Sequence, residues 1–129
     1  MPMMRFCLLA GSLLGAVSVA AGAFGAHGLK EFLEAHGQSA NWETAFRYSL
    51  VHALALVACG LAAAVLPSGG GWPLSAAAAC FLAGTLIFSG FLAALALSGI
   101  KILGAIVPIG GVLLIVGWLL LAAAAIRHD

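Results

Sequence analysis

Two histidines are the side chains in this sequence whose type and position could support chemistry. His27 follows a long uncharged run, and His52 lies inside the next one. Ionisable groups at membrane depth are costly and are therefore functional candidates. Histidines on adjacent helices could bind haem iron or a metal ion, or pass a proton. We favour the alternative of a neutral His52 that hydrogen-bonds a neighbouring helix, because no carboxylate or thiolate lies at a matching depth to complete a metal site.

Polar residues near His52 extend this candidate site towards the charged part of the chain. Glu43 and Arg47 are four residues apart with the acid first, which is the better orientation for an ion pair on a helix. The candidate functional or structural polar cluster comprises His27, Glu43, Arg47, Tyr48, Ser49, His52 and Lys101.

Six charged residues are expected on the side of the membrane that carries this cluster: Lys30, Glu31, Glu34, Glu43, Arg47 and Lys101. They form either a solvated, mutually neutralising collar or a recognition surface for lipid headgroups or a partner. We favour the collar, in which Arg47 extends its charged end to the interface beside Glu43.

The elements that must position these residues are transmembrane helices. The chain is 64% hydrophobic and only 7% charged, whereas about 25% of the residues in a soluble protein are charged. Uncharged runs long enough to cross a hydrocarbon core of about 30 Å predict spans at 6–26, 44–66, 74–97 and 102–126. Residues 27–43 are expected to lie at the interface as a short amphipathic segment. The sequence therefore predicts an all-α integral membrane four-helix bundle, with residues 1–129 as a single domain.

The first uncharged run has a competing interpretation as a secretory signal peptide. It follows the basic residue Arg5 and ends among small residues. However, it is longer than the 7–15 residues of a typical signal core. Gly11 and Gly15 also form a pair spaced for close helix packing, which a disposable signal does not need. We therefore predict that this run is a retained helix.

Glycines and one proline are expected to shape the bundle. Pro108 lacks an N–H and leaves the carbonyl of Gly104 without its helical partner, so we predict a kink there. Because freed backbone groups in lipid must find partners, we expect His52 or Ser49 to hydrogen-bond this backbone and tie the second span to the fourth. The residues predicted to serve packing or the kink are Gly11, Gly15, Gly22, Gly25, Gly104, Pro108, Gly110 and Gly111.

Several short motifs are spread along nearly the whole chain. They are Gly22-Ala-Phe-Gly-Ala-His-Gly-Leu29, Trp42, Tyr48-x-x-x-His52-Ala-Leu-Ala-Leu56, Gly84-Thr-x-x-Phe-Ser-Gly90, Pro108-Ile-Gly-Gly111 and Gly117-Trp118. In these motifs the chain resembles the YgdD-like family of small four-helix bacterial inner-membrane proteins, a domain-of-unknown-function family with relatives in eukaryotic membranes. The resemblance implies a plasma (inner) membrane location and a contribution to membrane integrity, with no established activity, substrate or cofactor.

An even number of spans places both termini on one side of the membrane. Arg5 and Arg127 lie on that side and three basic residues on the other, so the positive-inside rule is nearly balanced. We predict cytoplasmic termini.

The function predicted from these observations is that of an uncharacterised, non-enzymatic integral membrane protein that supports membrane or envelope integrity. No phosphate-binding loop, nucleophile–base pair or His-Glu-x-x-His motif is present. The alternative is a small oligomeric transporter or exporter that uses His52. We expect the lipid bilayer as a partner, together with a second copy or another membrane protein. A net charge of +1 argues against nucleic acid, and no catalytic residue, metal or cofactor is expected.

Overall fold

Four long helices and one short helix make up most of the chain. The computed structural model describes residues 2–127. The elements are α1 (Pro2–Ala26), α2 (Lys30–Ala35), α3 (Ser39–Val65), the 3₁₀ helix η1 (Pro67–Gly70), α4 (Gly71–Ser98) and α5 (Leu103–Ile126). The helices α1, α3, α4 and α5 are each long and apolar enough to cross a membrane. The predicted all-α four-helix membrane bundle is confirmed.

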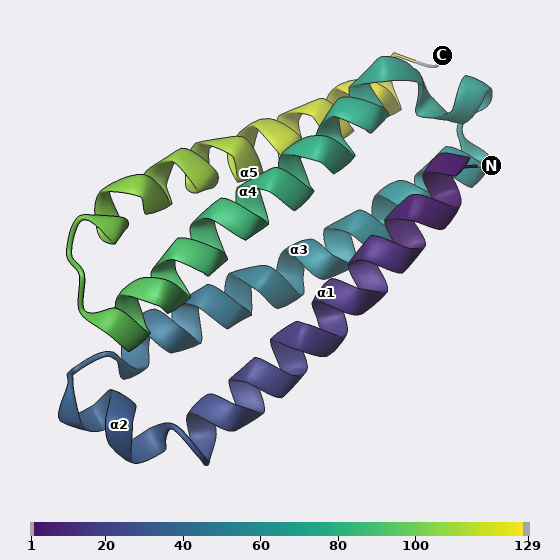
Figure 1. The fold of residues 1–129 in the computed structure, drawn as a ribbon. Helices are drawn as coiled ribbons and strands as arrows, with labels where there is room; N and C mark the ends of the chain where they lie inside the picture. Colours follow the sequence, from purple (N-terminus) through teal and green to yellow (C-terminus); the bar gives the residue numbers. More distant parts are fainter. Residues whose placement is uncertain (1, 128–129) are drawn as a thin grey trace.

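The long helices pack in the order α1, α3, α4, α5. The most extensive contacts join α4 to α5, α1 to α3, and α3 to α4. Figure 1 shows that α1 begins and α5 ends at the same end of the bundle. The short helix α2 and the turn between α4 and α5 lie at the opposite end (Figure 1). The charged residues of both connections therefore gather at one end of the bundle.

Two helices begin earlier than the hydropathy pattern predicts. The helix α3 starts at Ser39 rather than near residue 44. Its first turn consists largely of polar residues, which form helical hydrogen bonds but lie outside the apolar run used to predict the span. The helix α4 starts at Gly71 and includes Pro73, whereas the predicted span begins at residue 74. Proline fits there because the first N–H groups of a helix have no helical partner. Positive φ angles at Gly69, Gly70 and Gly71 reverse the chain just before and at the start of α4.

Glycines bring the backbones of neighbouring helices into contact. A Cβ atom on Gly11 of α1 would lie 2.8 Å from the carbonyl oxygen of Ala53 on α3. A Cβ atom on Gly110 of α5 would collide with the backbone of Phe88 and lie 2.7 Å from the carbonyl oxygen of Gly84, both on α4. Close approach of this kind is how membrane helices gain van der Waals packing.

Three other glycines that were predicted to serve packing or the kink do not lie against the backbone of a neighbouring helix. A Cβ atom on Gly111 would make only ordinary contact with the Phe88 ring, at 3.6 Å, and one on Gly22 would meet nothing within 4 Å. A Cβ atom on Gly104 would lie 3.4 Å from Leu95. The helix α5 is continuous through Pro108.

The adjacent positions Gly110 and Gly111 provide a matched test of this packing. Gly110→Ala should lower the free energy of unfolding by about 1–3 kcal/mol, because the new methyl group meets backbone that cannot move aside. Gly111→Ala should be neutral or stabilise by up to about 1 kcal/mol through helix propensity. Unfolding in mixed detergent micelles, followed by circular dichroism, measures both. Equal effects of the two substitutions would contradict the packing of α4 on α5 described here.

Candidate functional site

The centre of the bundle holds a layer of buried polar side chains, here called the polar layer. Its members are at most 5% exposed and come from three helices: Ser18 on α1, Ser49 and His52 on α3, and Thr85 and Ser89 on α4. Polar groups buried among helices in hydrocarbon must find partners within the protein. The hydrogen bonds of this layer therefore show what its side chains are available to do.

His52 uses both of its ring nitrogens. The indole Nε1 of Trp118 on α5 donates to His52 Nε2 at 3.0 Å, and His52 Nδ1 lies 2.7 Å from the Tyr48 carbonyl oxygen. Because an indole N–H can only donate and a carbonyl can only accept, Nδ1 carries the proton and Nε2 is the acceptor. His52 is thus held as the neutral Nδ1–H tautomer between α3 and α5.

The partner predicted for His52 is therefore wrong, although the histidine does connect the second span to the fourth. His52 and Pro108 line the same cavity of about 410 Å³, but the histidine bonds the Trp118 indole instead of the backbone near Gly104. Ser49 does not reach that backbone either, because it faces α1. The rotation of α5 about its own axis turns Trp118 towards α3, and this makes Trp118 the partner of His52.

Two serines link α1 to α3. The hydroxyl of Ser18 donates to the Leu14 carbonyl at 2.6 Å and lies 2.6 Å from the hydroxyl of Ser49. Since the single hydrogen of Ser18 is used on Leu14, Ser49 donates to Ser18. Both hydroxyl groups are therefore committed to the α1–α3 contact.

Trp42 makes a second link between the same two helices. Its indole Nε1 donates to the Ala21 carbonyl of α1 at 2.9 Å. A Cβ atom on Gly25 would collide with this indole ring. Gly25 is thus required by the side chain of Trp42, which lies against the last turns of α1.

Two members of the polar layer have no partner. Among residues 2–127, the hydroxyl oxygens of Thr85 and Ser89 are the buried side-chain oxygens without a hydrogen bond. Thr85 lies between Phe81 and Phe88 along α4, and these rings pack against His52 and Tyr48 at centroid distances of 5.7 and 4.9 Å. Thr85, Ser89 and Trp118 were not predicted as site residues, since only the packing of the helices buries the two hydroxyls and brings Trp118 to His52.

The structure does not bring His27 to His52. His27 is exposed in the turn after α1, whereas His52 lies about 20 Å along α3 from its first residue. Within the described chain, no group of three or more histidine, cysteine, aspartate or glutamate side chains could hold a metal ion. Lys101 is exposed in the turn between α4 and α5.

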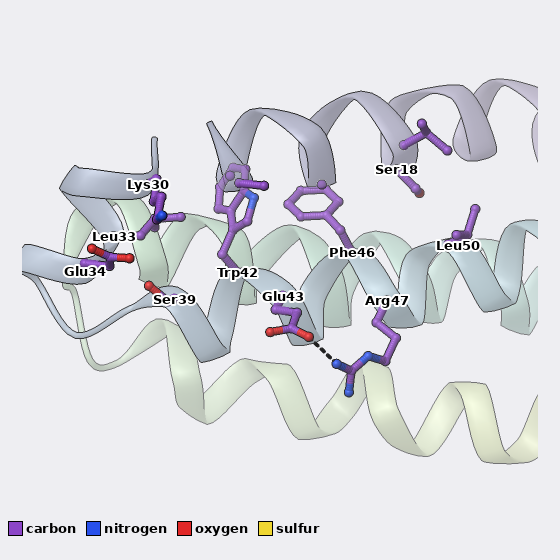
Figure 2. Close-up of a pocket in the computed structure, with 14 residues that line it drawn as sticks. Ser18, Lys30, Leu33, Glu34, Ser39, Trp42, Glu43, Phe46, Arg47 and Leu50 are labelled. Carbon is purple, nitrogen blue, oxygen red and sulfur yellow. Dashed lines mark hydrogen bonds and ion pairs between the residues drawn. The ribbon is translucent and has the colours of Figure 1, made fainter. Parts of the chain in front are cut away.

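A groove of about 690 Å³ lies between α1, α2 and α3; we call it the interfacial groove. Its apolar wall includes Val19, Gly22, Trp42, Phe46 and Leu50. Its charged rim consists of Lys30, Glu34, Glu43 and Arg47. Figure 2 shows Phe46 and Trp42 directed from α3 towards α1, with Lys30 and Glu34 at the end formed by α2.

The predicted ion pair between Glu43 and Arg47 forms at this rim. It is the only ion pair among residues 2–127, and the side chains are 69% and 62% exposed. An exposed pair of this kind adds little to stability. The rim charges therefore remain accessible to a ligand in the groove.

The hydrogen bond between Trp118 and His52 can be tested by a double-mutant cycle. His52→Ala and Trp118→Phe should each lower stability in detergent, and their effects should be coupled by about 0.5–1.7 kcal/mol. Trp72→Phe, at the exposed start of α4, is the control and should show no coupling to His52. Strictly additive effects of His52→Ala and Trp118→Phe would refute a bond between these side chains.

Comparison with known proteins places the chain in a family. The family described as "Protein of unknown function (DUF423)" matches residues 21–111. UPF0382 membrane proteins of Staphylococcus aureus and Staphylococcus epidermidis are each 40% identical over 124 residues, covering 96% of this chain and 98% of the relative. No solved structure matches the chain significantly. These relatives and the four apolar helices show that the chain is a multi-pass membrane protein that belongs to the DUF423 family.

Proposed function

We propose that this protein is non-enzymatic and supports the integrity of the bacterial inner membrane by holding a bilayer lipid in the interfacial groove. The observation that carries the proposal is the groove itself, which joins an apolar wall to a charged rim. A lipid has the same two parts in the same order, with its acyl chains in the hydrocarbon and its headgroup at the interface.

The dimensions of the groove suit part of a lipid. Its volume of about 690 Å³ falls in the range of about 300–1,000 Å³ typical of small-molecule sites. Phe46 and Leu50 on α3 and Val19 on α1 supply apolar surface for an acyl chain. Trp42 gives this wall a fixed position, because its indole is bonded to the Ala21 carbonyl.

The hydrogen bonds of the polar layer support a non-enzymatic role. The ring nitrogens of His52 are engaged by Trp118 and Tyr48, and the hydroxyls of Ser18 and Ser49 join α1 to α3. A general base or nucleophile needs a lone pair or proton that can reach a substrate. In these residues those atoms are engaged in hydrogen bonds within and between the helices.

The proposal includes the finer assignment to the YgdD-like family and an inner-membrane location with cytoplasmic termini. The order of motifs from Gly22 to Trp118 supports the family assignment. The common end at which α1 begins and α5 ends supports a shared side for the termini (Figure 1).

Blocking the groove tests the proposal. Gly22 lines the groove, and a Cβ atom there would meet nothing within 4 Å, so Gly22→Leu should extend into the groove without disturbing the fold. Displacing two buried methylene groups of a lipid, each worth about 0.8 kcal/mol, should weaken lipid binding about tenfold. Native mass spectrometry of the purified protein measures the lipid retained.

Gly90→Leu is the matched control, because Gly90 also has open space around it and lies on α4, away from the groove. Loss of lipid from the Gly22→Leu variant alone is expected, together with increased dye permeability of cells that carry it as their only copy. Equal lipid retention by both variants and the unaltered protein would refute lipid binding in this groove.

A small oligomeric transporter that uses His52 is a second candidate function. The observation that favours it is that Thr85 and Ser89 have unpaired hydroxyls in the same buried layer as His52. Trp118 must release Nε2 before that atom can take up a proton.

Proton-coupled transport predicts that proteoliposomes dissipate an imposed pH gradient faster than protein-free vesicles, and that His52→Gln abolishes the difference. A pH-sensitive dye inside the vesicles measures the rate. Identical decay with and without the protein contradicts this second function.

A further inference from the structure

We infer that the lipid held in the interfacial groove is zwitterionic and carries a primary ammonium group beyond its phosphate, as phosphatidylethanolamine does. This inference rests on the proposed function, because it concerns the headgroup of a ligand in the same groove. It is carried by the number, sign and order of the charges along the rim.

The rim has no net charge. Lys30 and Arg47 contribute two cations, and Glu34 and Glu43 contribute two carboxylates. An anionic headgroup would gain from the cations but would also lie beside both carboxylates. A headgroup with one phosphate and one ammonium can place an opposite charge against each type of side chain. The composition of the rim therefore favours a zwitterion.

Along α3, the order of the charges matches the order within such a headgroup. Arg47 lies one helical turn, about 6 Å, further into the bundle along α3 than Glu43. Glu34 lies on α2 together with the second cation, Lys30, at the outer end of the groove (Figure 2). In a phospholipid the phosphate is next to the glycerol and acyl chains, and the ammonium is further out. Arg47 is thus placed for the phosphate, and Glu34 and Glu43 for the ammonium.

The rim side chains retain hydrogen-bonding capacity for this ligand. The Arg47 guanidinium has five N–H donors, and its bond to Glu43 comes from Nη2 alone. The Glu43 carboxylate accepts that bond through Oε1, which leaves Oε2 free to accept another. A primary ammonium offers three N–H donors to the carboxylates, whereas a quaternary choline offers none. This difference favours the primary ammonium.

The experiment is a titration of the full-length protein in detergent with phosphatidylethanolamine, phosphatidylcholine and phosphatidylglycerol that carry identical acyl chains. Native mass spectrometry measures each bound lipid. We expect phosphatidylethanolamine to bind about tenfold more tightly than the other two, because it alone gains charge-assisted hydrogen bonds at both ends of the headgroup.

Two rim variants separate the contributions of the headgroup. Glu34→Gln should reduce the preference for phosphatidylethanolamine, because it removes one carboxylate from the ammonium. Arg47→Gln should weaken all three lipids about tenfold, because they share the phosphate. Glu31→Gln and Lys101→Gln are the matched controls, since neither residue lines the groove, and both should bind like the unaltered protein.

The possible results distinguish the headgroup from the groove. Equal binding of the three lipids, or a preference for phosphatidylglycerol, overturns the inference, and so does an effect of Glu31→Gln as large as that of Glu34→Gln. If unselective binding is still lost in Gly22→Leu, the groove binds lipid and only the headgroup assignment fails. If no lipid binds, both proposals fail, and a photo-crosslinker at Gly22 that captures a protein would identify a different class of occupant.

Discussion

The hydrogen bond from Trp118 to His52 is the interaction that joins the last helix of the bundle to the second span. The helix α5 packs chiefly on α4, so its connection to α3 depends on a small number of side chains that reach past this contact. The bond is strongly constrained, because the indole can only donate and the Tyr48 carbonyl can only accept. His52 therefore has one orientation and one tautomer in which all three groups are satisfied.

The need of buried polar groups for hydrogen-bond partners also determines the contact between α1 and α3. Ser18 and Ser49 satisfy each other at the level of the polar layer, and Trp42 bonds the Ala21 carbonyl nearer the interface. Glycine makes these bonds possible, since a side chain at Gly25 would displace the indole. Close packing of α1 on α3 and the hydrogen bonding of their buried polar groups therefore depend on the same residues. The residues that bring α1 and α3 together also fix the wall of the interfacial groove.

The groove exists because α1 and α3 separate from close contact as they approach α2. Gly11 lies against the α3 backbone, but Gly22 faces open space within the groove. The side chains of the charged rim are exposed to solvent, so their charges change the free energy of unfolding little. Their arrangement is then free to serve a ligand, and the charges we expected to act as a collar acquire a second role in the proposed function.

The composition and the spacing of uncharged runs were enough to predict the four helices and the membrane environment, and an i,i+4 spacing was enough to predict the ion pair between Glu43 and Arg47. These properties are local or summed along the chain, so they require no knowledge of which helix packs on which. The partner of His52, the unpaired hydroxyls of Thr85 and Ser89, and the groove beside Gly22 were decided by the tertiary structure. Each depends on the rotation and depth of one helix relative to another, and a uniformly apolar helix carries little information about either.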